Sequence, residues 1–249
     1  MPPLRLLVCT TLIGLALCAR DAAAGDLSLQ LAAWDHDVKG HARDAQGAVD
    51  FEQLGVDGDV EPYARLQWRQ DDGSWWPDAA LTYCRLQAQG SNVVTTSVSI
   101  GDVVVLPGGT AAADADVHDS TLTLSYPLLR RVIAFDAGVS LRHLGGDILI
   151  ENANSRASDR QRVDQLFPLL HAALALPIGS RLSLVADGGW IEHRDDRAYE
   201  IHAGIDARLW RSLSLQAGWM KKRYDVLQQD YQLDATLSGL RIGLGWRFE

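Results

Sequence analysis

Two residues of the sequence are spaced as the base and nucleophile of a hydrolase. His118 and Ser120 are separated by one residue, so on a β-strand they share a face. A histidine beside a serine could activate the hydroxyl to attack an ester, which in a membrane protein indicates lipid hydrolysis. Any H-x-S on a strand meets this condition, and the sequence identifies no orienting third group and no oxyanion donor. We therefore expect that the chain is not an enzyme, with lipid hydrolysis by His118 and Ser120 as the alternative hypothesis.

A second group of residues carries carboxylates, which are the ligands that Ca²⁺ prefers. Asp57 and Asp59 lie close in sequence to Glu52 and Glu61, but the ligand spacing of an EF-hand is absent. A solvated acidic loop explains this composition. Cys84 is the only cysteine after residue 24, and we interpret it as a small apolar side chain on a strand. We expect no metal ion and no cofactor.

A third group consists of charged residues within segments of alternating hydrophobicity. Alternation with a period of two places successive side chains on opposite faces of a strand. Four acids, four arginines and one histidine then share the polar faces and are expected to line a barrel lumen: Asp136, Arg142, Asp187, Glu200, His202, Asp206, Arg208, Arg241 and Arg247. Their balanced charges favour a satisfied interior network of ion pairs. The alternative is that the arginines line a narrow channel for small solutes or anions.

Strands are the elements that must position these residues. Near the C-terminus, Leu240, Ile242 and Leu244 share one face, while Arg241 and Gly243 share the other. Ten strands are predicted at 27–38, 60–69, 79–89, 117–126, 132–144, 163–176, 181–193, 198–209, 212–225 and 231–248. Long connections are predicted at 39–59, 90–116 and 145–162. Short and long connections take turns, as in transmembrane barrels, which puts the chain ends on the periplasmic side.

One further segment bears on the number of strands. Residues 92–105 alternate well enough to form an extra hairpin, which leaves eight or twelve strands as alternatives to ten. In lipid, every backbone N–H and C=O must be paired within the protein, and a sheet achieves this only by closing on itself. We therefore predict an all-β, transmembrane, antiparallel up-and-down β-barrel. It is expected to be monomeric and to contact outer-membrane lipid.

Composition and charge exclude several other classes. The 249 residues include 32 acids and 23 bases, for a net charge of −9, so no basic patch for nucleic acid is expected. No apolar run reaches the ~18 residues that a spanning helix requires. Residues 1–24 have the features of a secretory signal peptide, with Arg5 before an apolar stretch at 6–17 and alanines at 22–24. The sequence therefore predicts a signal peptide at 1–24 and a barrel domain at 25–249, exported by the Sec pathway.

Three segments of the chain resemble a family of small outer-membrane β-barrels of Gram-negative bacteria with unknown function. They are residues 49–56 (VDFEQLGV), 120–129 (STLTLSYPLL) and 134–142 (AFDAGVSLR). The resemblance implies the fold, a location in the outer membrane and a structural or surface-exposed role in the envelope, and it carries no catalytic residue. Leu244, Trp246 and Phe248 also look like the C-terminal signal that such proteins present to the barrel-assembly machinery. Glu249 follows Phe248 and departs from that pattern.

Overall fold

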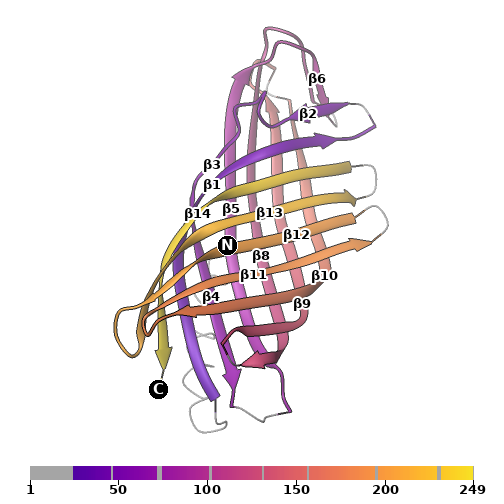
Figure 1. The fold of residues 1–249 in the computed structure, drawn as a ribbon. Helices are drawn as coiled ribbons and strands as arrows, with labels where there is room; N and C mark the ends of the chain where they lie inside the picture. Colours follow the sequence, from indigo (N-terminus) through magenta and orange to yellow (C-terminus); the bar gives the residue numbers. More distant parts are fainter. Residues whose placement is uncertain are drawn as a thin grey trace, which may run out of the picture.

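The computed structural model describes residues 25–249 except 46, 72–74, 101–102, 131, 156, 194–195, 229–230 and 249. The predicted signal peptide, residues 1–24, lies outside the described residues. Within them, ten long strands form one closed antiparallel barrel, which confirms the predicted fold class and strand number (Figure 1). No helix in this part of the chain is long and apolar enough to cross a membrane.

The barrel has up-and-down topology, in which each long strand pairs with its neighbours in the chain. The ten strands are β1 (Gly25–Arg43), β4 (Val60–Gln70), β5 (Asp78–Val93), β8 (Thr110–Arg130), β9 (Ala134–Asn152), β10 (Ser158–Ile178), β11 (Leu182–His193), β12 (Asp196–Arg208), β13 (Leu213–Gln228) and β14 (Tyr231–Phe248). The sheet closes between β1 and β14, from Leu27 opposite Phe248 to Arg43 opposite Gln232. Closure removes the exposed edges that an open sheet would present.

Alternation of side chains explains why these segments form the wall. On β9, Val139 and Leu141 are 55% and 45% exposed, while Ser140 and Arg142 are 5% and 3% exposed. Apolar side chains therefore point outward at this level and polar side chains point inward. A shift of the register by one residue would exchange the two faces, so the alternation fixes the pairing of the strands.

The connections between strands differ at the two ends of the barrel. At the end that holds Gly25 and Phe248, which we call the lower end, the strands are joined by short connections, such as residues 209–212 between β12 and β13. The opposite end is the upper end. At the upper end, residues 44–59 and 94–109 form the long connections, which carry β2 (Ala48–Asp50), β3 (Asp57–Gly58), β6 (Val98–Ile100) and β7 (Val103–Val105) (Figure 1). β6 and β7 form a separate hairpin, so residues 92–105 add no strand to the barrel.

The prediction of a long connection at 145–162 was wrong. β9 continues to Asn152 and β10 begins at Ser158, so most of this segment is paired strand. In this segment the apolar side chains point inward and not outward, because Ile148, Ile150 and Val163 are buried in the interior. Apolar packing inside the barrel stabilises pairing here, beyond the part whose outer face is apolar.

Candidate functional site

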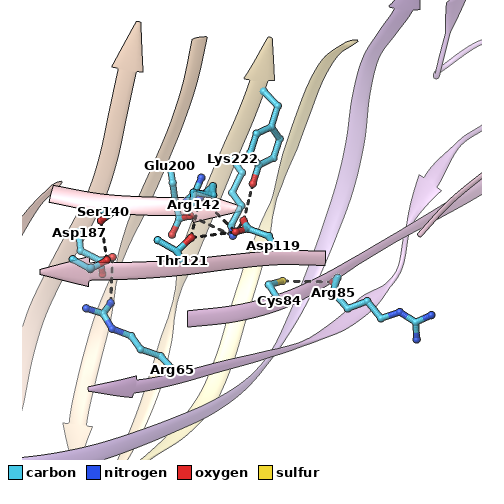
Figure 2. A network of polar contacts seen from close by, with 12 residues as sticks. Arg65, Cys84, Arg85, Asp119, Thr121, Ser140, Arg142, Asp187, Glu200 and Lys222 are labelled. Atoms are coloured by element: carbon cyan, nitrogen blue, oxygen red, sulfur yellow. Dashed lines mark hydrogen bonds and ion pairs between the residues drawn. The ribbon is translucent and has the colours of Figure 1, made fainter. Parts of the chain in front are cut away.

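A ring of four buried charged side chains bridges the barrel interior, and we call it the central cluster. It consists of Asp119 (β8), Arg142 (β9), Glu200 (β12) and Lys222 (β13) (Figure 2). Lys222 Nζ donates to Asp119 Oδ2 at 2.6 Å and lies 3.3 Å from Glu200 Oε2. Arg142 pairs with Glu200 through Nη2, and its Nε lies 3.5 Å from Asp119 Oδ1. Each acid therefore contacts both bases, and the charges cancel within the ring.

Neutral partners complete the central cluster. Tyr224 Oη donates to Asp119 Oδ2 at 2.7 Å, and Thr121 Oγ1 donates to Asp119 Oδ1 at 3.2 Å. Lys222 Nζ also lies 5.7 Å from the centre of the Trp34 ring. A buried charge is costly unless it is paired and hydrogen-bonded, and the Asp119 carboxylate meets both conditions. The side chains of Asp119 and Lys222 are each only 1% exposed.

A second buried group, which we call the lower cluster, links four strands, of which β12 also contributes to the central cluster. Arg65 (β4) Nη1 lies 3.5 Å from Asp187 (β11) Oδ2, and His202 (β12) Nδ1 lies 3.1 Å from Asp187 Oδ1. Arg241 (β14) Nη2 lies 3.0 Å from His202 Nε2, and its guanidinium stacks 4.4 Å from the centre of the Tyr63 ring. A guanidinium can only donate, so this contact assigns an accepting Nε2 to His202 and leaves Nδ1–H to donate to Asp187.

The two clusters connect opposite walls of the barrel. In the ring of ten strands, β8 and β13 are five positions apart, and so are β4 and β11. The Lys222–Asp119 and Arg65–Asp187 ion pairs therefore each cross the interior. A barrel of about eight strands is already filled by its interior side chains, and ten strands give only slightly more room. The described side chains close the barrel at this level.

The structure brings five of the predicted lumen residues together and separates the other four. Arg142 and Glu200 belong to the central cluster, and Asp187, His202 and Arg241 belong to the lower cluster. The other four lie nearer the end with short connections. Asp136 Oδ1 lies 3.4 Å from Arg130 Nη2, Asp206 accepts hydrogen bonds from Ser214 and Gln216, and Arg208 and Arg247 line the opening of the barrel.

Sequence reasoning missed three residues that carry the ion pairs across the barrel. Gln216, Gly218 and Met220 alternate with outward residues, and Lys222 continues this pattern by two residues. The period of two could therefore have placed Lys222 on the inward face. Asp119 likewise continues the face of Thr121. The contacts with Asp119 and Asp187 could not be predicted, because they depend on which strands face each other across the closed barrel. Arg65 is the third of these residues.

His118 and Ser120 lie on the outer face of β8, on the side opposite to the buried Asp119. Tyr83 Oη lies 3.1 Å from His118 Nδ1. Ser120 lies directly opposite His143 of β9. His143 Nε2 lies 3.1 Å from Asp164 Oδ1 on β10, so a serine, a histidine and an aspartate occupy three adjacent strands.

The acidic residues of the first long connection do not converge. Glu52 faces Lys39 at 3.6 Å, whereas Glu61 is 4% exposed and its Oε1 accepts a hydrogen bond from the backbone N–H of Gln87. Asp59 Oδ1 accepts from the backbone N–H of Val60. Within the described residues, no group of three or more histidine, cysteine or acidic side chains is placed to bind a metal ion.

A belt of exposed apolar side chains surrounds the barrel and decides its environment. On β14, Leu240, Ile242 and Leu244 are all at least half exposed. Soluble monomers rarely expose a continuous apolar surface of this extent. Trp190 and Trp219 lie on the outer face at the upper edge of the belt, as aromatic rings do at a membrane interface. The chain is a transmembrane β-barrel of the outer-membrane type. Barrels of this type usually place their long connections on the extracellular side.

The last residues of the barrel carry the predicted assembly signal. Leu244, Trp246 and Phe248 all lie on the outer face of β14 and are about half exposed, at 50%, 48% and 45%. Trp246 lies opposite Leu29 of β1 and Leu213 of β13, within the closing seam of the barrel. These three side chains are therefore accessible on the outer face of the closed barrel.

No protein-family model and no curated protein matches this sequence. Solved structures with a similar fold include the translocator domain of autotransporter NalP from Neisseria meningitidis, at 12% identity, 97% coverage of this chain, 95% coverage of that chain and a TM-score of 0.47. Ail of Yersinia pestis has 8% identity, coverages of 90% and 99%, and a TM-score of 0.36. The transport unit of autotransporter AIDA-I from Escherichia coli has 9% identity, coverages of 92% and 92%, and a TM-score of 0.47. These similarities extend no further than the barrel architecture.

Proposed function

We propose that this protein is a sealed barrel of the Gram-negative outer membrane that serves a structural role and presents its upper end at the cell surface. Residues 1–24 direct Sec-dependent export, and Leu244, Trp246 and Phe248 are recognised by the barrel-assembly machinery. The mature protein works as a monomer in contact with outer-membrane lipid. The upper end projects because β9 and β10 remain paired beyond the level at which their outer faces become polar.

This proposal rests on two ion pairs that cross the interior of the barrel. Lys222 with Asp119, and Arg65 with Asp187, place paired charges between facing walls. An open aqueous channel would instead leave charged side chains separated and hydrated. The side chains of Asp119, Arg142 and Lys222 are at most 4% exposed, so water has little access to them.

Planar-bilayer recording tests the seal. The purified barrel is expected to give no discrete conductance steps. The double variant Lys222→Ala with Arg65→Ala shortens both crossing cations and is expected to produce steps. A difference in migration between unboiled and boiled samples of the same protein on a denaturing gel shows that the variant has closed its barrel. Conductance steps from the wild-type protein, or a closed double variant without steps, would contradict the proposed seal.

A second candidate function is lipid hydrolysis, which is favoured by the position of Ser120 opposite His143. His143, oriented by Asp164, would accept the hydroxyl proton as Ser120 Oγ bonds to the acyl carbon of a lipid ester. The alcohol would leave with that proton, and water would then release the fatty acid from the serine. These residues lie at the upper edge of the apolar belt, next to Leu122 and Leu141, where lipid esters are within reach.

The hydrolase hypothesis is tested with purified barrel in phospholipid vesicles. Release of fatty acid by the wild-type protein, abolished by Ser120→Ala and His143→Gln, would establish hydrolysis in place of a purely structural role. The matched control is Ser238→Ala, which removes another hydroxyl from the outer face. Equal background release by all four proteins would exclude the hydrolase.

A further inference from the structure

A polar cavity at the lower end of the barrel concentrates positive charge. The cavity measures about 120 Å³ and its lining includes four arginines from separate segments: Arg69 (β4), Arg208 (β12), Arg211 (residues 209–212) and Arg247 (β14). We call it the arginine vestibule. Arg69, Arg208 and Arg247 share the inward face of their strands with Gln67, Asp206 and Gly245. This accumulation is unexpected in a chain whose net charge is −9.

The charges of the arginine vestibule are not balanced by its own side chains. The single acid in the lining is Asp206, and its Oδ2 already accepts hydrogen bonds from Ser214 Oγ at 3.1 Å and Gln216 Nε2 at 2.7 Å. Among the described residues, the guanidinium groups of Arg208, Arg211 and Arg247 have no hydrogen-bond or ion-pair partner. Among the described lining residues, four cations and one acid leave an excess of three positive charges, which attracts anions to this opening.

Arg69 adds an independent observation that points to a ligand. Its Nε is buried and has no hydrogen-bond partner. A buried donor without a partner costs about 1–3 kcal/mol. An anion in the vestibule would supply the acceptor that the protein does not provide. In the central cluster, by contrast, each base is paired with both acids, although Arg142 Nη1 has no hydrogen-bond partner.

The vestibule is closed on its upper side. Asp187 and Arg65 of the lower cluster lie further up the interior and form an ion pair between opposite walls. On the proposed function, in which this ion pair helps to seal the barrel, an anion that enters from the lower end has no path through it. This position favours a binding site with one entrance over the mouth of an anion channel.

We propose that the arginine vestibule binds a phosphate group from the periplasmic side of the membrane. Guanidinium groups bind phosphate through paired, charge-assisted hydrogen bonds, and four of them match the several acceptor oxygens of a tetrahedral anion better than those of a planar carboxylate. The cavity of about 120 Å³ also exceeds the ~30 Å³ that one water occupies in the liquid, so it has room for a group larger than water. Free phosphate and the phosphate of a lipid headgroup are the two sources of this chemistry.

Calorimetric titration of the full barrel in detergent with inorganic phosphate is the direct test. Saturable binding by the wild-type protein is expected, with a dissociation constant raised at least tenfold by Arg208→Gln combined with Arg247→Gln. The matched control combines Arg160→Gln with Arg162→Gln, two arginines on the outer face of β10 at the upper end. The control is expected to bind phosphate as the wild type does, and the affinity of both should fall as salt increases.

A second arm distinguishes the two sources. The barrel is placed in nanodiscs of phosphatidylcholine, with or without phosphatidylglycerol, and retained lipid is counted by native mass spectrometry. Selective retention of phosphatidylglycerol by the wild type, lost in the Arg208→Gln, Arg247→Gln variant, supports a lipid headgroup as the source of the phosphate. Binding of free phosphate without selective retention of phosphatidylglycerol supports the soluble anion. If the wild type binds neither, or if the double variant matches the control in both arms, the proposal is wrong. Gel migration of unboiled protein shows that each variant has folded.

Discussion

The membrane-level part of the barrel and the upper part, which we propose lies outside the cell and call the extracellular part, have opposite distributions of polarity. At the level of Leu141, apolar side chains face outward and Arg142 lies in the interior. Three residues further along β9, Leu144 is buried inside, and the next outward residues include Asp147 and Glu151. In the membrane-level part of this wall, apolar side chains face outward, which suits contact with lipid. In the extracellular part they face inward, as they do in a water-soluble protein.

This difference shows how continuous strands can serve two solvents. The strand pairing does not change between the two parts, because β9 stays paired with β8 and β10 from one part into the other. Only the side chains change, and each part has its own source of stability. Ion pairs hold the interior of the membrane-level part, and burial of residues such as Ile148 and Leu237 holds the extracellular part.

The largest expected effect comes from breaking the central cluster. Lys222→Ala leaves Asp119 and Glu200 buried with one cation fewer, so the free energy of unfolding should fall by about 3–5 kcal/mol. Lys221→Ala is the matched control, because Lys221 is the neighbouring residue on the outer face, and it should change the stability little. Urea unfolding in detergent measures both variants. Equal losses would show that the membrane-level interior does not depend on ion pairs.

A smaller effect is expected from one apolar truncation on each face of β9. Leu144→Ala opens a cavity inside the extracellular part and should cost about 2–5 kcal/mol. Leu141→Ala removes the same atoms from the outer face, where lipid or detergent fills the space, and should cost clearly less. The comparison uses the same urea unfolding experiment. A greater loss for Leu141→Ala would contradict an apolar core at the upper end.

The boundary between the parts can be mapped by adding a charge along the outer face of β14. Ile242→Arg lies within the belt and should cost about 2–4 kcal/mol in a bilayer near the midplane. Thr236→Arg lies on the same face, beyond the belt, and should cost about 0–1 kcal/mol. Unfolding of both variants in lipid vesicles gives the two values, and similar costs would place the membrane differently.

The sequence predicted the wall of the barrel well because a strand in lipid must alternate strictly. Residues 240–248 and 132–144 could be assigned to strands from this period alone. The upper strands were missed at 145–162, where apolar side chains such as Ile148 face inward and the polar outer residues resemble a loop. Apolar and polar residues still alternate there, but the prediction assigned a strand only where the apolar residues faced outward.

The candidate site was predicted as a set of residue types but without its contacts. Arg142, Glu200 and His202 were identified from their polar faces, and the structure places all three in the interior. Asp119 and Lys222 are 103 residues apart, and their contact depends on the size of the closed ring and on the stagger of its strands. Neither property can be derived from local periodicity, since a change in strand number would place different residues opposite each other.

Pairing between β1 and β14 joins the two ends of the barrel sequence. Leu27 lies near the start of the first strand and its partner Phe248 ends the last one, so the seam can form only when the whole chain from β1 to β14 is present. Until then both strands expose an unpaired edge. A chain that loses its final strand would keep such an edge, which can join other chains.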